Sequence, residues 1–387
     1  MGDSPFLAEI FSLPDLIQES NTWLASSSAR LAELIAGQDI SQIVLTGCGD
    51  SHHAAIASRL AFQQLAGLPC QAMTAMELAR YQAAQLRLEK TGRTLVVGIS
   101  SSGQVSRTVE ALEMAKLAGA TVLAVTGNLQ SDLSGVADAV YQVTEARPLP
   151  HGKGVIIPGT RTFFLSLLAL YHLAIQIGMA RGTRPTSKLV TLNAELGGMA
   201  DLVEQTITQC NSSIVKLTDD WSDADRFVFC GSGPNYGTAL FSAAKMIEAA
   251  GDPALGQDLE EWAHLQYFER QVDTPTVIIS AMEHDGDRAH ELTMAAKAIG
   301  RRVVLITSGF GVTIEKPQES QHLIAVGKVS DCFSPVLTSL PGMLLAAYRS
   351  EAISEPFFRG FGGGRSRKGG GGISRIRSSN RLRAILD

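Results

Sequence analysis

Short apolar runs alternate with helical stretches along this chain, and the alternation occurs twice. In the first half, the runs QIVLTG, TLVVGI and TVLAVTG have the length and composition of strands, and helical stretches rich in Ala and Leu lie between them. Strands that alternate with helices of this length pair in parallel through right-handed crossovers. The sequence therefore predicts an α/β fold with a parallel sheet between two layers of helices (three-layer α/β/α, flavodoxin-like).

The same order returns after residue 195, where RFVFCGSG, PTVIISA and RVVLITSG are the candidate strands. We interpret this as a coarse internal duplication, in which CGDS corresponds to CGSG and ISSSG to the region of SAMEHDGD. The expected organisation is a helical segment (1–40), two α/β domains (41–190 and 191–350) and a Gly/Arg-rich tail (351–387).

Composition narrows the function classes. A net charge of −5 gives no reason to expect nucleic acid or an anionic membrane as partner. The most apolar stretch, TFFLSLLALYHLAIQIG, suits a buried helix, and the first residues do not resemble a signal peptide. Five scattered cysteines fit reduced thiols in a cytoplasm, and the only close histidine pair, His52–His53, is unsuited to one metal. We therefore expect a cytoplasmic protein without a metal or other cofactor.

Hydroxyl groups gather at the turn that follows TLVVGI. At the carboxyl end of a parallel strand, a turn that leads into a helix is the usual ligand crevice of an α/β sheet. Ser100, Ser101 and Ser102 would add donors to the free N–H groups of the helix start, and Gly103 would let the backbone approach an anion. A helix cap explains one serine but not three, although serines also collect in ordinary turns.

A second strand–turn–helix junction, TGCGDSHHA, contributes Gly49 and Ser51. It lacks the GxGxxG pattern, and no Walker lysine follows it, so nucleotide binding is poorly supported. Two neighbouring crevices with serine donors favour a small phosphorylated ligand.

Together, two segments resemble the first of the two sugar isomerase (SIS) domains in the glucosamine-6-phosphate synthase family: GCGDSHHAAIASRLAFQQLAGLP and ISSSGQVSRTVEALEMAKLAGA. The doubled arrangement of this chain looks like the isomerase half of that family, and the resemblance covers nearly the whole chain. The resemblance implies that Ser51, Ser100, Ser101 and Ser102 hold a sugar phosphate. This chain departs from the family at Val105, where a threonine is usual, and Ser106 is the next hydroxyl.

Glu248, Lys245 and His264 in the second half are candidate catalytic groups. Glu248 shares a helical face with Phe241, and Lys245 lies three residues before it. Spacing alone favours an exposed ion pair. The resemblance implies instead that Glu248 moves a proton between C1 and C2, next to Lys245. It also implies that His264, in EEWAH, assists ring opening from the neighbouring subunit of a homodimer; taken alone, His264 fits a structural role.

The tail is where the resemblance is weakest. The synthase family ends in a loop whose lysine reaches the sugar; Lys368, the only lysine in this tail, is the candidate catalytic residue that replaces it. Arg375 and Arg377 could clamp the substrate but could not act as bases, because arginine stays protonated. Thr160 stands where the family has a further substrate-binding loop. We expect a tail that closes over the ligand, rather than an RNA-binding arm.

These observations predict a phosphosugar isomerase, or an amino sugar phosphate isomerase or deaminase, that works through an enediol or enediolamine at C1 and C2. No amidotransferase segment or N-terminal cysteine is present in the sequence, so we expect no glutamine-dependent activity. The alternative is a non-catalytic sugar-phosphate sensor or regulator, for which Glu248 and His264 would be unnecessary.

Overall fold

The computed structural model describes residues 4–86, 92–150, 156–309, 322–361 and 378–385. The chain divides into two compact units, each assembled from separate stretches. We name them by their sheets: the first-sheet unit contains Asp15–Pro148, Arg161–Gly198 and Arg365–Asp387, and the second-sheet unit contains Met1–Pro14, Leu149–Thr160 and Met199–Gly364. These units are not identical in extent with the domains expected from the sequence, whose boundaries remain a prediction.

The first-sheet unit is built on a five-stranded sheet in the order β2-β1-β3-β4-β5, and all of its pairings are parallel. The strands are β1 (Ile40–Gly47), β2 (Cys70–Thr74), β3 (Arg93–Ile99), β4 (Thr121–Thr126) and β5 (Ala139–Gln142). The three central strands coincide with the three apolar runs of the first half, so the parallel α/β arrangement is confirmed there. The edge strands β2 and β5 are short and partly exposed, which explains why no apolar run indicates them.

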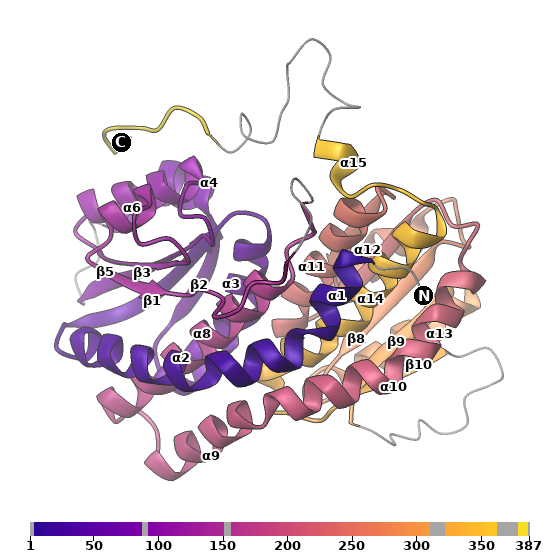
Figure 1. The fold of residues 1–387 in the computed structure, drawn as a ribbon, viewed down its shortest axis with the longest axis horizontal. Helices are drawn as coiled ribbons and strands as arrows, with labels where there is room; N and C mark the ends of the chain where they lie inside the picture. Colours follow the sequence, from indigo (N-terminus) through magenta and orange to yellow (C-terminus); the bar gives the residue numbers. More distant parts are fainter. Residues whose placement is uncertain (1–3, 87–91, 151–155, 310–321, 362–377, 386–387) are drawn as a thin grey trace. The chain divides into compact units, whose positions relative to one another are not determined.

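Helices cover both faces of this sheet (Figure 1). One face carries α6 (Ser106–Leu117) and a segment of short helical turns, and the other carries α2, α3 and α8. The remaining bounds are α2 (Leu13–Ala36), α3 (Asp50–Ala61), η1 (Phe62–Ala66), α4 (Ala75–Glu77), η2 (Leu78–Gln82), α5 (Ala83–Leu86), α7 (Asp132–Val136), α8 (Arg161–Arg181) and α9 (Thr186–Gly197).

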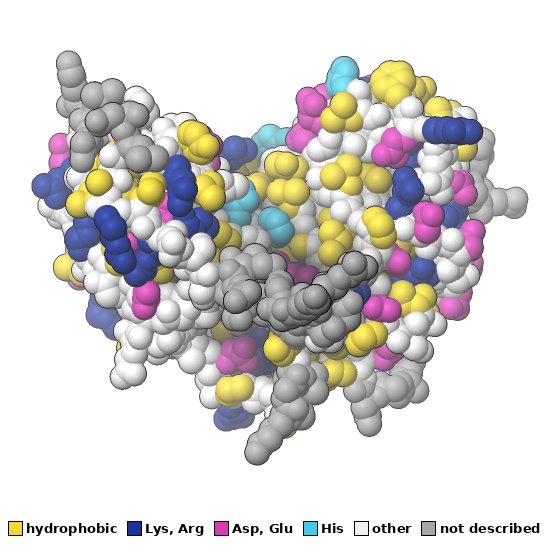
Figure 2. All heavy atoms as spheres, turned by 90° about the horizontal axis from the view of Figure 1, so that it is seen from above, with side chains coloured by type: hydrophobic (Ala, Val, Ile, Leu, Met, Phe, Trp, Pro, Cys, Tyr) yellow, Lys and Arg dark blue, Asp and Glu magenta, His cyan; other side chains and the backbone are white. Residues whose placement is uncertain are grey.

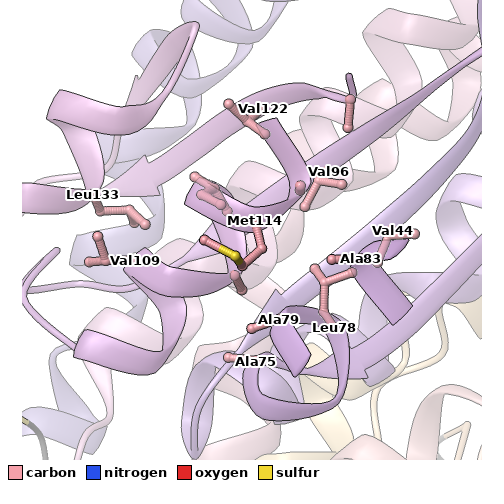
Figure 3. Close-up of a cluster of buried hydrophobic side chains, with 14 of the residues drawn as sticks. Val44, Ala75, Leu78, Ala79, Ala83, Val96, Val109, Met114, Val122 and Leu133 are labelled. Atoms are coloured by element: carbon pink, nitrogen blue, oxygen red, sulfur yellow. The ribbon is translucent and has the colours of Figure 1, made fainter. Parts of the chain in front are cut away.

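The core under α6 combines residues from strands and helices. Val44, Val96 and Val122 point from β1, β3 and β4 toward Met114 and Leu112 of α6. Figure 3 shows this cluster together with side chains of the segment 75–83. Alternation along each strand points every second side chain to this face. These side chains pack against the residues of α6 that recur at helical spacing on its inner face.

Helix α8 is the apolar stretch that the sequence analysis assigns to a buried helix. By length and composition it is the one helix among the described residues that could cross a membrane, with a mean hydropathy of 1.8. In the structure 83% of that window is buried inside the protein. Its His172 is also buried, with Nε2 2.6 Å from Asn21 Oδ1 of α2.

The second-sheet unit contains a parallel sheet in the order β7-β6-β8-β9-β10, which is the strand order of the first sheet. The strands are β6 (Phe227–Gly231), β7 (Ala254–Asp258), β8 (Pro275–Ser280), β9 (Arg302–Ser308) and β10 (His322–Val326). The three expected strands are again the central ones. The sequence duplication that the shared order suggests remains a prediction.

Helices also cover both faces of the second sheet. Trp262 of α12 and Leu292 of α13 pack on Val228, Ile278 and Leu305 on one face. Helices α10, α11 and α14 pack together on the other. The bounds are α1 (Pro5–Phe11), α10 (Met199–Asp220), α11 (Pro234–Ala249), α12 (Leu259–His264), η3 (Gln266–Phe268), α13 (Gly286–Ala298), η4 (Asp331–Phe333), α14 (Pro335–Ala352) and α15 (Phe358–Phe361).

Two glycines correct the register of the expected duplication. Gly49 before α3 has φ 57° and ψ −129°, and Gly233 before α11 has φ 54° and ψ −126°. Both are helix N-caps in a conformation that favours glycine, so they occupy equivalent places. The matching of CGDS with CGSG is therefore wrong by two residues: Gly49 and Ser51 correspond to Gly233 and Asn235.

Basic and acidic side chains are interspersed on the surfaces of both units in the face that Figure 2 shows. The chain has 33 Lys and Arg residues against 38 Asp and Glu residues, so the mixture agrees with its small net charge.

The core under α6 leads to a first prediction. Leu112 is fully buried and lies directly on Gly98 of β3, where an added Cβ would overlap it. Leu112→Ala should lower the free energy of unfolding by about 2–5 kcal/mol, because it leaves a cavity. Leu129→Ala, at a 54% exposed position, should change it by less than about 0.5 kcal/mol. Chemical denaturation measures both, and equal effects would contradict the packing described.

Candidate active site

The register of β1 and β3 brings the two serine-bearing turns together. Gly47, the last residue of β1, pairs with Ile99, the last residue of β3. The turns that follow both strands therefore leave the sheet at the same edge and side by side, as the sequence analysis predicts. In parallel sheets this carboxyl edge is where ligands bind.

The first turn is shaped by close packing around Gly47. A Cβ on Gly47 would lie 2.7 Å from Ser51 Cβ and 3.0 Å from the carbonyl oxygen of Ile99. Only glycine leaves room there for the start of α3, and Gly49 then adopts the positive φ that turns the chain into the helix. Ser51 lies in the first turn of α3 and is half-buried.

The second turn is held in place from both sides. The hydroxyl of Ser100 accepts a hydrogen bond from the Gly103 N–H at 3.2 Å, and the carbonyl of Ser101 accepts from the Gly127 N–H at 3.0 Å. Gly103 has φ +66°, and a Cβ there would collide with Ser131 Oγ and lie 2.9 Å from Thr126 Oγ1. The loop after β4 thus fixes the shape of the serine turn.

The three serines of this turn differ in exposure. Ser100 is buried at 3% exposure and its hydroxyl closes the turn, whereas Ser101 and Ser102 are exposed. The next helix, α6, has Val105 as N-cap and no side-chain hydrogen bond at that cap. Because Val105 offers no hydroxyl, the first N–H groups of α6 and the hydroxyls of Ser101 and Ser102 are the donors available to an anion.

A charged cluster stands in the first turns of α6, and the sequence analysis assigned it no role. Glu110 is fully buried between Arg107, three residues earlier, and Arg80 of η2, whose Nε lies 2.8 Å from Glu110 Oε1. Two guanidinium groups share one carboxylate, which leaves an excess of positive charge. The signal in the sequence was an arginine in the first turn of the helix after the serines.

Cys48 lies beside the same helix turn. The Thr108 hydroxyl is 3.7 Å from the Cys48 Sγ. Burial raises the pKa of the Cys48 thiol, while the Thr108 hydrogen bond and the positive charge of Arg107 act against that rise. The thiol is therefore protonated at neutral pH, and Cys48 suits packing, as expected, better than nucleophilic chemistry.

Burial also sets the protonation state of His52. Desolvation, with a smaller contribution from the charge of His53, lowers the pKa of His52 to about 4. His52 is therefore neutral at pH 7 and adds no positive charge to the first turn.

The corresponding turns of the second sheet have a different chemistry. Asn235 takes the place of Ser51, and its amide is used in the core: Nδ2 donates to Ser334 Oγ at 3.1 Å, and Oδ1 accepts from Thr338 Oγ1 at 2.6 Å. After β8, the Ser280 hydroxyl donates to Asp285 Oδ1 at 2.6 Å. Carboxylates replace free hydroxyls, so this edge disfavours an anion.

Glu283, His284 and Asp331 lie together near that edge, with one ligand atom of each within 4.8 Å of the others. The sequence did not indicate this group, because Asp331 is far away in the chain. His284 Nδ1 is 2.7 Å from Asp331 Oδ2, and Glu283 Oε2 accepts the Asp331 N–H at 3.2 Å. These hydrogen bonds hold the three residues together.

Lys245 and Glu248 form an ion pair near the end of α11. Lys245 is fully buried, its Nζ lies 2.5 Å from Glu248 Oε2, and it stands 4.9 Å from the centre of the Phe241 ring. The Glu248 side chain is 26% exposed. The pair is therefore not the exposed ion pair that spacing alone favours: a buried ammonium holds a carboxylate that still reaches the surface of its unit.

Arg359 caps the helix that carries this pair. Its guanidinium donates to the carbonyl oxygens of Ile247, Glu248 and Ala249 at 2.7, 2.8 and 3.0 Å. A cation at a helix C-terminus satisfies carbonyls that have no partner in the helix. Truncation before this residue would thus disturb α11 as well as remove the tail.

His264 and Glu248 belong to helices on opposite faces of the second sheet. Helix α11, which carries Glu248, packs against α14 on one face, and Trp262 of α12, which carries His264, lies in the core on the other. The His264 ring is 67% exposed, and its Nε2 lies 3.3 Å from Glu260 Oε1. Within one chain the second sheet lies between the helices that carry His264 and Glu248.

The other expected binding residues give little support. The Thr160 hydroxyl is buried and donates to the carbonyl oxygen of Pro158 at 2.9 Å. This hydrogen bond indicates that Thr160 stabilises a local turn. Lys368, Arg375 and Arg377 lie outside the described residues.

A comparison with protein families matches the part of the chain that contains the first sheet. Residues 38–176 match the SIS domain family, and this range contains all five strands of the first sheet and both serine-bearing turns. The second sheet lies outside the matched range.

Over most of its length the chain is similar to glutamine–fructose-6-phosphate aminotransferases. The protein of Gloeobacter violaceus is 28% identical over 356 residues, which are 88% of this chain and 54% of that protein. That of Thermococcus kodakarensis is 28% identical over 340 residues, with 88% and 54% covered. The chain thus spans about half the length of the curated relatives that it matches.

Solved structures share the fold beyond the SIS domain. The C-terminal domain of glucosamine-fructose-6-phosphate aminotransferase from Francisella tularensis superposes with a TM-score of 0.77 at 19% identity, covering 90% of this chain and 96% of that one. A glucosamine-6-phosphate deaminase from Thermotoga maritima gives 0.60 at 19% identity, covering 90% and 94%.

The serine turn generates a second prediction. Gly103→Ala adds both left-handed strain, about 1–3 kcal/mol, and a collision with Ser131. Gly119→Ala is the matched control, because Gly119 has φ +94° and no neighbour within 4 Å of an added Cβ. We expect a clearly larger loss of unfolding free energy for Gly103→Ala. If chemical denaturation gave the same loss for both, the loop after β4 would not shape the turn.

Proposed function

We propose that this chain is a phosphosugar isomerase, or an amino sugar phosphate isomerase or deaminase, that acts at C1 and C2 of its substrate. The observation that carries the proposal is the pair of turns at the edge of the SIS domain, with the exposed hydroxyls of Ser101 and Ser102 at the uncapped start of α6. The identities of the relatives and the shared fold support a sugar phosphate as the ligand class.

The phosphate is assigned to these turns for electrostatic reasons. A dianion gains from the positive end of the α6 dipole, from unpaired N–H groups and from serine hydroxyls. Gly49 and Gly103 let the backbone come close to it, and Ser51 adds a hydroxyl from the neighbouring turn. Ser100 supports the turn from inside.

The proton transfer is assigned to Glu248. Its carboxylate takes the proton from C2 of the open-chain aldose, which gives an enediol, and returns it to C1, which gives the ketose. For an amino sugar the same shift gives an imine, which water hydrolyses to the ketose and ammonia. The buried Lys245 ammonium pairs with the Glu248 carboxylate and fixes its direction.

Ring opening is assigned to His264 of a second copy in a homodimer. Within one chain the helices of His264 and Glu248 lie on opposite faces of the second sheet, so the proposal takes the histidine from another subunit. An apolar surface adjoins His264: Leu265, Tyr267 and Phe268 are 54%, 37% and 74% exposed. Exposed aromatic side chains beside a functional histidine favour a protein contact there.

The first test is a panel of hexose and aminohexose 6-phosphates, scored for ketose formation and for ammonia release. We expect turnover of at least one member, and ammonia release separates deamination from isomerisation. Binding without any turnover would support the sensor alternative, and absence of both would contradict the proposal.

The second test replaces the proposed base. Glu248→Gln should lower kcat by about 10²–10⁴-fold, because the amide cannot accept the proton, and should leave the affinity for the substrate within a few-fold. Glu291→Gln is the control, since Glu291 forms an exposed i,i+3 pair with Arg288. Wild-type turnover by Glu248→Gln would remove the catalytic assignment.

A mixing experiment tests the origin of His264. Glu248→Gln and His264→Asn chains, each impaired alone, are co-refolded in equal amounts. If His264 acts across a dimer interface, half of the dimers are mixed and have one intact site, so about a quarter of wild-type activity should return. Failure of mixed dimers to regain activity would contradict a shared site.

A further inference from the structure

The last described residues of the chain, 378–385, lie along α6 in the first-sheet unit. The Ser379 N–H donates to Ser106 Oγ at 3.0 Å. The Arg107 guanidinium donates to Ser379 Oγ at 3.1 Å and to the carbonyl oxygen of Asn380. These contacts fall on the first turn of α6, directly after the serine turn.

Arg107 is oriented from its other side by buried charge. The Glu110 carboxylate has no exposed surface and is shared between Arg107 and Arg80. Because two guanidinium groups face one carboxylate, the cluster keeps one uncompensated positive charge. Among the described residues, the buried Nε of Arg107 has no hydrogen-bond partner. The guanidinium is therefore fixed in direction and still has bonding capacity.

The position of Arg107 connects both serine-bearing turns. It lies four residues after Gly103, and its charge acts on the Cys48 thiol in the neighbouring turn. Thr108, the next residue, contacts Cys48 directly. Arg107 is therefore close to the first turn, through Cys48, and follows the second turn by four residues.

We infer that Arg107 is a phosphate-binding residue of the proposed sugar-phosphate site and that residues 378–380 compete with the phosphate for it. This rests on the proposed function. A guanidinium binds phosphate oxygens through two parallel charge-assisted hydrogen bonds, which are stronger than bonds to a serine hydroxyl and a carbonyl. A dianion therefore displaces the chain end from Arg107.

Apolar contacts keep the chain end close when the phosphate binds. Leu382 and Ile385 pack against the core cluster that contains Met114. Leu382 and Arg383 also line a cavity of about 460 Å³ with Glu113, Leu117 and Val136. These apolar contacts of Leu382 and Ile385 are separate from the hydrogen bonds at Ser379 and Asn380, so the apolar contacts and the hydrogen bonds can be tested independently.

The test is calorimetric titration of the full chain with fructose 6-phosphate, glucosamine 6-phosphate and inorganic phosphate. Arg107→Met should weaken binding about 10- to 100-fold, the usual effect of removing a charged hydrogen-bond donor. The affinity of Arg107→Lys should lie between those of the wild type and Arg107→Met. Arg107→Lys keeps the charge beside Glu110 and so guards against loss of folding. Arg30→Met, an exposed arginine that bonds only to Ser27 of its own helix among the described contacts, should bind as wild type.

A second variant tests the competition. Leu382→Ser removes the apolar anchor and should tighten phosphate binding at least twofold, because the chain end then competes less. Unchanged affinity of Leu382→Ser would overturn the competition.

The outcomes separate this inference from the proposed function. Wild-type affinity in folded Arg107→Met, together with weaker binding in Ser102→Ala, would overturn the role of Arg107 and leave the serine site standing. If wild-type protein bound none of the three ligands, the proposed function would fall, and the role of Arg107 with it.

Discussion

The parallel pairing of β1 with β3 is the constraint on which the proposed site depends. Hydrogen bonds between the strands set Gly47 opposite Ile99, so two turns that are 52 residues apart in the chain start at one edge. A shift of this register by one residue would turn every side chain of the strand to the other face of the sheet. The buried valines on the face under α6 exclude such a shift. Core packing thereby fixes the spacing of the serine hydroxyls.

The two sheets show how one topology can carry different chemistry. Both have the same strand order and the same glycine conformation before the first crossover helix. In the first sheet the turns present hydroxyls and an excess of positive charge near Arg107. In the second sheet the matching places hold Asn235 and Asp285. The Asn235 amide is hydrogen-bonded within the core, and the Asp285 carboxylate accepts a hydrogen bond from the Ser280 hydroxyl. The fold supplies the crevice, and the side chains decide whether an anion fits it.

The central strands were predictable because burial on both faces leaves continuous apolar runs in the sequence. The edge strands were not, because their short, half-exposed segments carry no such pattern, and their pairing depends on neighbours that are already in place. The serine turns were predictable for a related reason: glycine and serine are required locally, by a positive φ and by the start of a helix. The exact correspondence between the two halves was not predictable. CGDS and CGSG look alike, but the structural equivalent of Gly49 is Gly233, the last residue of CGSG and not its second.

By itself the sequence determined the α/β class, the order of the central elements and the hydroxyl-rich turn, since each of these depends on residues close together in the chain. Only the tertiary structure decided which of these hydroxyls face outward, that Glu110 holds two arginines, and that the helices of Glu248 and His264 lie on opposite faces of their sheet. These features depend on contacts between residues far apart in the chain. Periodicity and motif spacing carry no information about such contacts, because they are set by how the strands pair and the helices pack.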